Sequence, residues 1–221
     1  MNGGRWIFLD KDGTLVEDVP YNVDPDKIVL KPGAERGLAR LHQAGYRFVV
    51  ASNQSGVARG KFPIEALDGV EDHLRRLLRE RTGAEPQAFY WCPHHPEGSI
   101  REYAKECECR KPKPGMMLAA ARYLDIRLED AWMIGDILND VEAGNRAGCQ
   151  TILIDNGGET EWLPGPFRRP DFTARDLEEA AEIILAEGGG PRALDESIGV
   201  GANGATVSQE SVARKAGNHE Q

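Results

Sequence analysis

The sequence predicts an α/β fold, in which a mostly parallel β-sheet lies between two layers of helices. Short apolar runs, each of the length of a buried strand, occur at 6–9, 47–51, 88–91, 131–134 and 151–154. Segments with a helical pattern separate or follow these runs, at 33–44, 63–80, 115–124, 138–147 and 176–186. Because right-handed crossovers join parallel strands, this alternation predicts a Rossmann-like three-layer sandwich.

Local signals mark the ends of several of these elements. In the first expected helix, Leu38 and Leu41 form a one-sided apolar stripe, and Gly45 gives a stop signal. Pro112 is well placed to start the helix expected at 115–124, because proline is favoured in a first helical turn.

The chain length suits one domain with a core of its own. The sequence has 221 residues, which leaves little for a second domain. From Gly188 onward it is rich in Gly, Ala, Ser and Asn, and it lacks aromatic residues and sustained periodicity. We therefore expect one domain over residues 1–187 and a disordered tail over 188–221.

The charge balance excludes one class of partner. Lys and Arg total 27 against 36 Asp and Glu, a net charge of −9, which argues against nucleic acid but not against a small phosphorylated metabolite. The apolar run at 6–9 is too short for a signal peptide, and no run approaches the ~20 apolar residues of a membrane helix. We expect a cytoplasmic monomer without a membrane partner.

Polar residues follow three of the predicted strands, at the edge of a parallel sheet where ligands bind. After the first strand, Asp10 and Asp12 with Gly13 form a plausible hard-cation site or, alternatively, an acidic turn. After the second, the hydroxyl of Ser52 and the amides that follow it could donate hydrogen bonds to phosphoryl oxygens, or form a polar turn. After the fourth comes Asp136.

Two further groups of charged residues accompany these motifs. Arg110 and Lys111 precede the helix at 115–124 and supply cations. Asp140 either positions a metal ion through water or opens the helix at 138–147. The sequence leaves both roles of Asp140 open.

Cysteine and histidine residues form a second constellation. Cys92, Cys107 and Cys109 lie close together in the sequence, and the imidazoles of His94 and His95 follow the first thiol. Without an export signal, this crowding favours metal ligation over disulfide bonds, and three thiols plus one imidazole suit structural zinc. Chance clustering of reduced thiols is the alternative. Cys149 is expected to be a small buried apolar residue.

The order of the motifs carries a family resemblance. An acidic pair, a hydroxyl loop, a basic residue and a second acidic loop occur in the order found in the haloacid-dehalogenase superfamily of phosphatases. More narrowly, the chain resembles the D-glycero-D-manno-heptose 1,7-bisphosphate phosphatases and the related histidinol-phosphate phosphatases. The similarity covers about residues 6–162, and its specific strings lie at 10–14, 52–60, 92–96 and 107–116.

The resemblance implies a role for each residue of the reaction centre. Asp10 would be the nucleophile that forms an aspartyl-phosphate, and Asp12 the general acid and base. Mg²⁺ would be held by Asp10, the main-chain carbonyl of Asp12, and Asp136. Ser52 and Lys111 would bind the transferring oxygens and neutralise developing charge.

The resemblance also implies contacts to substrate and to zinc. The residues expected to contact substrate are Asp18, Tyr21, Asn53, Gln54, Ser55 and Arg110. A structural Zn²⁺ would be bound by Cys92, His94, Cys107 and Cys109. It would order this loop and thereby position Arg110 and Lys111.

The implied reaction is removal of the 7-phosphate of D-glycero-D-manno-heptose 1,7-bisphosphate. Histidinol phosphate is the alternative substrate, and Ile137 bears on the choice because some heptose bisphosphatases have lysine there. A zinc-stabilised binding protein is the non-enzyme alternative, although it would need no such catalytic set. Residues 13–52 are too few for a large cap domain, so the substrate should be small.

Overall fold

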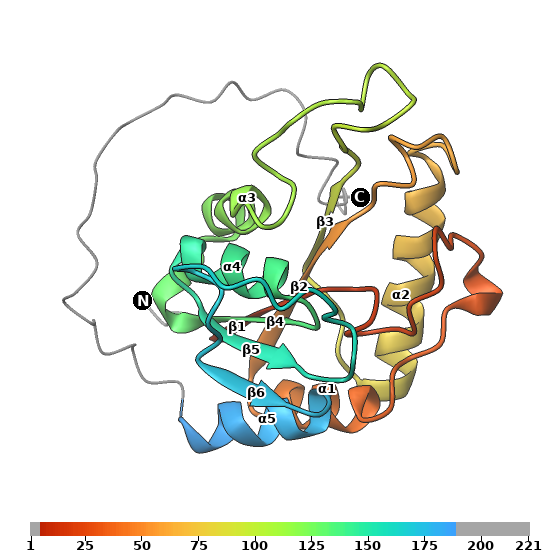
Figure 1. The fold of residues 1–221 in the computed structure, drawn as a ribbon. Coiled ribbons are helices and arrows are strands. Elements are labelled where there is room, and N and C mark those ends of the chain that lie inside the picture. The colour runs from red at the N-terminus through yellow and green to blue at the C-terminus, as the bar shows by residue number, and fades with distance from the viewer. Residues whose placement is uncertain (1–4, 189–221) are drawn as a thin grey trace.

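The computed structural model describes residues 5–188 and contains a six-stranded parallel sheet in the order β3-β2-β1-β4-β5-β6 (Figure 1). The strands are β1 (Arg5–Leu9), β2 (Tyr46–Asn53), β3 (Ala88–Cys92), β4 (Ala131–Gly135), β5 (Gln150–Ile154) and β6 (Phe172–Ala174). The chain runs outward from β1 to β3, returns to the middle at β4, and runs outward again to β6. The carboxyl ends of strands at such a reversal flank a crevice where ligands bind.

Helices cover both faces of the sheet. They are α1 (Ala34–Gln43), α2 (Ala66–Thr82), α3 (Gly115–Leu124), α4 (Leu138–Ala147) and α5 (Leu177–Ala186), with short 3₁₀ helices η1 (Pro25–Lys27) and η2 (Leu128–Asp130). Figure 1 shows α3 and α4 on one side of the sheet and α1, α2 and α5 on the other. Across residues 5–188, no helix is long and apolar enough to span a membrane.

The side chains of β1 alternate between two hydrophobic cores. Ile7 and Leu9 are buried in the core formed with α1, α2 and α5. Phe8 is buried in the second core, together with Met116 of α3 and Met133 of β4. Because the sheet is covered on both faces, its central strands are continuously apolar rather than alternating.

A short antiparallel contact fixes the segment that follows β1. Val16 forms a β-bridge with Leu30, and the Lys31 N–H donates to the Leu15 carbonyl oxygen at 3.0 Å. Between residue 13 and the start of β2 at Tyr46 the chain adds only η1 and α1 to this contact. The sheet edge is therefore covered by loops rather than by a cap domain.

The predicted strands and helices are all present, and the differences lie at element ends and at the sheet edge. β2 extends to Asn53, and α2 begins at Ala66 rather than at residue 63. β6 was not predicted, because its three residues are too few to show a strand pattern. The predicted tail lies, except for Gly188, outside the described residues.

Candidate active site

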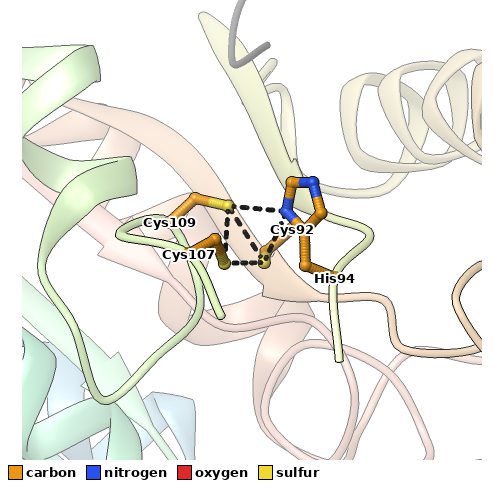
Figure 2. A group of neighbouring side chains, drawn as sticks. All are labelled: Cys92, His94, Cys107 and Cys109. Carbon is orange, nitrogen blue, oxygen red and sulfur yellow. Dashed lines mark hydrogen bonds between the residues drawn. The ribbon is translucent and has the colours of Figure 1, made fainter. Parts of the chain in front are cut away.

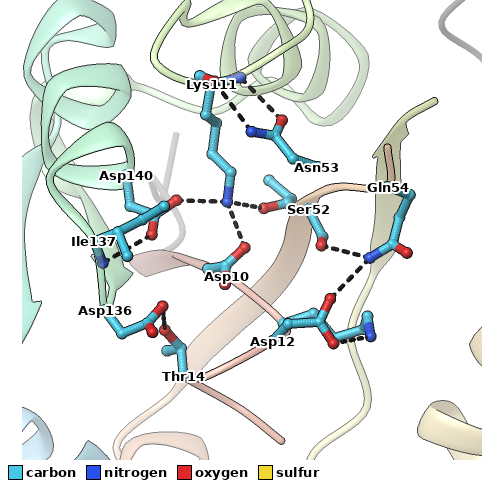
Figure 3. A network of polar contacts seen from close by, with 12 residues as sticks. Asp10, Asp12, Thr14, Ser52, Asn53, Gln54, Lys111, Asp136, Ile137 and Asp140 are labelled. Carbon is cyan, nitrogen blue, oxygen red and sulfur yellow. Dashed lines mark hydrogen bonds and ion pairs between the residues drawn. The ribbon is translucent and has the colours of Figure 1, made fainter. Parts of the chain in front are cut away.

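Charged side chains meet at the carboxyl ends of β1 and β4 (Figure 3). Asp10 follows β1 directly, Asp136 follows β4 directly, and Asp140 lies in the first turn of α4. The Lys111 Nζ contacts Asp10 Oδ1, lies 2.6 Å from Asp140 Oδ1, and donates to the Ala51 carbonyl oxygen at 2.8 Å. Three oxygen atoms therefore surround the ammonium of Lys111.

The buried carboxylates form a site with a strong need for positive charge. One oxygen each of Asp10, Asp136 and Asp140 lies within 4.8 Å of the others. Burial raises the pKa of Asp10 well above its usual value, with Lys111 opposing and Asp140 adding to this effect. Burial and then Asp140 raise the pKa of Asp136 to about 7. A hard cation with oxygen ligands would relieve this repulsion, so the donor set fits Mg²⁺.

Lys111 is held in its charged form by the same carboxylates. Burial alone would lower the pKa of Lys111, but Asp10 and Asp140 raise it above its usual value. Asp140 also accepts a hydrogen bond from the Ile137 N–H at the start of α4, at a long 3.4 Å. Its side chain therefore contacts both the charged cluster and the start of α4. The second contact is the helix-opening alternative, whereas the positioning of a metal ion through water stays a prediction.

Two glycines allow the backbone to close around Asp136. Gly13 has φ +84°, and a Cβ there would lie 2.1 Å from Asp136 Oδ2. A Cβ on Gly158 would lie 2.2 Å from the same oxygen. Asn156 Nδ2 donates to the Gly13 carbonyl oxygen at 2.9 Å and thereby joins the segment after β5 to the turn after β1. Sequence reasoning missed Asn156, although it follows β5 at the same sheet edge as the predicted site residues.

The carboxylate of Asp12 is turned away from this cluster (Figure 3). Its Oδ1 accepts from Lys11 Nζ, and its Oδ2 accepts from Gln54 Nε2 at 2.9 Å. Gln54 Nε2 also lies 2.9 Å from the Ser52 hydroxyl, to which it donates. Lys11 and Ser52 are both buried. Lys11 and Gln54 thus fix the orientation of Asp12 beside Ser52.

Asn53 binds the main chain of Lys111 rather than pointing a free amide into the site. Its Oδ1 accepts from the Lys111 N–H at 3.0 Å, and its Nδ2 donates to the Lys111 carbonyl oxygen at 3.1 Å. Asn53 ends β2, so this pair of bonds ties the Lys111 loop to the sheet.

A cavity of about 400 Å³ opens over the cluster. The predicted site residues that line it are Asp10, Asp12, Asp18, Ser52, Asn53, Lys111 and Asp136. Its lining also includes Glu17 and Lys31, which sequence reasoning did not single out.

Four residues expected to contact substrate are absent from the lining: Tyr21, Gln54, Ser55 and Arg110. Arg110 Nη1 instead lies 3.3 Å from the His94 carbonyl oxygen, to which it donates. The Tyr21 ring lies 5.7 Å from Lys61 Nζ. Gln54 reaches the site only through Asp12 and Ser52.

The side chains of Cys92, His94, Cys107 and Cys109 converge (Figure 2), and none of the four lines the cavity. Their sulfur atoms are 3.0 to 3.5 Å apart, and His94 Nδ1 lies 3.3 Å from Cys109 Sγ. Sulfur ligands at ~2.3 Å around a tetrahedral zinc would be about 3.8 Å apart, close to this spacing. His95 lies outside the cluster, because its Nε2 is 3.1 Å from Arg59 Nη2.

Main-chain hydrogen bonds join the loop that carries this cluster to the segment that follows β2. The N–H groups of Ser99 and Ile100 donate to the Ala58 carbonyl oxygen at 2.8 and 2.9 Å. The Ala58 N–H in turn donates to the Pro93 carbonyl oxygen at 3.2 Å. Lys111 follows Cys109 closely and lines the cavity, so the conformation of this loop affects where the Lys111 side chain lies.

Comparisons with known proteins agree on one family. A family model described as "HAD-hyrolase-like" matches residues 108–180. The D-glycero-beta-D-manno-heptose-1,7-bisphosphate 7-phosphatase of Escherichia coli (strain K12) is 38% identical over 178 residues, covering 80% of this chain and 92% of that protein. The protein of the same name from Pseudomonas aeruginosa is 33% identical over 180 residues, covering 81% and 97%.

Solved structures give the same result. The D,D-heptose 1.7-bisphosphate phosphatase from B. bronchiseptica, complexed with magnesium and phosphate, has a TM-score of 0.67 and 34% identity, covering 83% of this chain and 99% of that one. The D,D-heptose 1,7-bisphosphate phosphatase from Burkholderia thailandensis has a TM-score of 0.54 and 28% identity, covering 82% and 99%.

Proposed function

Because this chain belongs to the haloacid-dehalogenase-like phosphatases, magnesium-dependent hydrolases of phosphoric monoesters, we propose that it removes the 7-phosphate of D-glycero-D-manno-heptose 1,7-bisphosphate. The observation that carries the reaction type is the buried cluster of Asp10, Asp136, Asp140 and Lys111 at the base of the cavity. The substrate named for relatives that match most of this chain supports the choice of sugar phosphate.

The cluster fits a magnesium ion held by Asp10, Asp136 and the main-chain carbonyl of Asp12. Such an ion would supply positive charge to the phosphoryl oxygens as negative charge develops on them. Gly13 and Gly158 keep the backbone close to Asp136, and Thr14 donates to Asp136 Oδ1 at 3.1 Å. These contacts hold the Asp136 carboxylate in one orientation.

The chain's own residues then perform an in-line transfer to Asp10. An Asp10 carboxylate oxygen attacks the phosphorus, forming an aspartyl-phosphate as the bond to the sugar oxygen breaks. The Lys111 ammonium and the Ser52 hydroxyl bind the transferring oxygens and stabilise their charge. Lys111 is suited to this, because Asn53 and Asp140 fix it while its Nζ stays beside Asp10.

Asp12 moves the protons of both half-reactions. In its acid form it protonates the departing sugar oxygen, and the resulting carboxylate then takes a proton from the water that attacks the aspartyl-phosphate. Lys11 and Gln54 hold this carboxylate beside Ser52 and turned away from Asp10, so Asp12 must turn from them to reach the sugar oxygen. Asp10 regains its carboxylate when inorganic phosphate leaves.

The thiol and imidazole cluster fits a structural zinc ion. Three thiolates and one imidazole would fill a tetrahedral coordination shell and leave no position for substrate. Zinc would therefore order residues 92–109 and, through Cys109, position Arg110 and Lys111. The zinc ion would thus contribute to the reaction by positioning these side chains and not by binding substrate.

Histidinol phosphate remains the second candidate substrate, because Ile137 gives the cavity wall no charge and Glu17 and Asp18 could accept hydrogen bonds from an amino group.

Turnover of both compounds by the purified enzyme, with ³¹P NMR identifying the phosphate that remains, tests the proposal. We expect the 1-phosphate to be retained and kcat/KM to favour heptose bisphosphate at least about tenfold, roughly 1.4 kcal/mol of discrimination. Preference for histidinol phosphate, or loss of the 1-phosphate, would refute it.

A further inference from the structure

The cavity offers few cations to a substrate with two phosphates. Six of its lining residues are acidic: Asp10, Asp12, Glu17, Asp18, Asp136 and Asp140. The basic residues in the lining are Lys31 and Lys111. Lys111 is committed to the reaction centre, because its ammonium contacts Asp10, Asp140 and the Ala51 carbonyl oxygen. Arg110 is turned toward the His94 carbonyl oxygen and does not line the cavity.

The main chain fixes Lys31 relative to the reaction centre. Its N–H donates to the Leu15 carbonyl oxygen at 3.0 Å, and its own carbonyl oxygen accepts from the Ala34 N–H, also at 3.0 Å. Leu15 belongs to the turn that follows Asp10, and Ala34 begins α1. The backbone of Lys31 is thus joined to both the nucleophile loop and a helix, so its side chain starts from a fixed point.

The side chain of Lys31 retains capacity for a ligand. It is 24% exposed, and its Nζ lies 3.1 Å from Glu17 Oε2. An ammonium can donate three hydrogen bonds, and the Glu17 carboxylate, itself 45% exposed, can turn to solvent. Lys31 can therefore exchange or share this partner when a stronger anion arrives.

The cavity has a closed end and an open end. Asp10, Asp136 and Lys111 are buried and define the closed end, whereas Glu17, Asp18 and Gly157 are exposed. A substrate whose scissile phosphate lies at Asp10 must extend toward the exposed side. Glu17 pairs with Lys31, so Lys31 supplies the positive charge on that side.

We propose that Lys31 determines specificity by binding the second phosphate of the substrate, the one that is not hydrolysed, with Glu17 holding the lysine in place before substrate arrives. This inference rests on the proposed function, since it requires a bisphosphate. Lysine recognises phosphate as a point charge and can donate up to three hydrogen bonds to its oxygens. The alternative is that Lys31 and Glu17 form a surface ion pair of little energetic value.

The test compares the ratio of kcat/KM for D-glycero-D-manno-heptose 1,7-bisphosphate to that for p-nitrophenyl phosphate, which has no second phosphate. We expect Lys31→Met to lower this ratio about 10- to 100-fold, the usual loss of one charged hydrogen bond, mainly through KM for the bisphosphate. Lys31→Arg should restore most of the ratio. Glu17→Gln should raise KM for the bisphosphate, because Lys31 is then held less firmly in place before substrate arrives.

Lys27→Met is the matched control. Lys27 lies in the same segment and also pairs with a carboxylate, Asp24, at 3.2 Å, but it does not line the cavity. If the wild type prefers the bisphosphate, an unchanged ratio in Lys31→Met, or an equal fall in Lys27→Met, would overturn the role of Lys31. The proposed substrate would still stand. A wild type that hydrolyses p-nitrophenyl phosphate but not the bisphosphate would overturn the proposed substrate as well.

Discussion

Asn53 holds Lys111 by both main-chain polar groups, accepting from its N–H at 3.0 Å and donating to its carbonyl oxygen at 3.1 Å. Asn53 belongs to β2, whereas Lys111 lies in the loop before α3. The ammonium of Lys111 can therefore lie at Asp10 only if this loop is tied to the sheet. The relationship gives Asn53 a positioning role that is independent of any contact with substrate.

Asn53→Ala should lower kcat about 10- to 100-fold, because a displacement of about 1 Å at a reacting group can have this effect. The loss of two hydrogen bonds should also lower the free energy of unfolding by about 1–3 kcal/mol. Steady-state kinetics together with denaturant unfolding measure both effects. Asn145→Ala is the control, since Asn145 donates to the Phe167 and Arg169 carbonyl oxygens away from the cavity. Equal kcat values in the two variants would argue against the positioning role.

Asp12→Asn should reduce turnover of alkyl phosphates by ~10²–10⁴-fold, the usual contribution of proton transfer. Aryl phosphates with good leaving groups need little protonation and should lose less. A series of substrates with graded leaving-group pKa values measures this difference. If alkyl and aryl phosphates lost activity equally, Asp12 would not be the acid.

Removal of divalent cations should stop turnover reversibly, since Asp10, Asp136 and Asp140 lie close together with raised pKa values for Asp10 and Asp136. Added Mg²⁺ should restore the rate. Ca²⁺ should inhibit, because its larger and looser coordination sphere would disturb the approach of Asp10 to phosphorus. Full activity in chelator without a divalent cation would rule out the metal-dependent mechanism.

Purified protein should contain about one zinc ion per chain, bound through three thiolates and one imidazole. Cys107→Ser should lose this zinc, raise KM and lower kcat, because Arg110 and Lys111 lose their support. The sheet lies outside the loop, so the domain should stay folded. Metal analysis, circular dichroism and kinetics measure these three outcomes.

Cys149→Ala is the control for the zinc prediction. Cys149 is buried in the core that also contains Cys92, but it lies outside the four-residue cluster. This variant should keep its zinc. Wild-type protein without zinc, or unchanged kinetics in zinc-free Cys107→Ser, would exclude a structural zinc that supports Lys111.

Much of the reaction centre could be predicted because its residues end strands. Asp10, Ser52 and Asp136 each lie at the carboxyl end of a strand, and these ends meet at one edge of a parallel sheet. The thiol cluster could be predicted because Cys92 ends β3 and Cys107 and Cys109 are close in sequence. In both cases local sequence position determines spatial position.

Contacts made by loops could not be predicted in this way. Lys111 is 101 residues from Asp10 in the sequence, and only the folded chain shows that Asn53 holds it there. Arg110 is adjacent to Lys111 yet turns toward His94. These orientations depend on hydrogen bonds made by an irregular segment, the loop before α3, for which no periodic pattern exists.

The turnover of Asp10→Asn shows whether Asp10 is the nucleophile, because the amide is nearly isosteric with the carboxylate but cannot form the acyl phosphate. The measurement is kcat for the purified, folded variant with the best phosphate ester of the wild type. If Asp10 is the nucleophile, turnover should not exceed the background of a sample without enzyme. Retention of a tenth or more of wild-type activity would contradict Asp10 as the nucleophile.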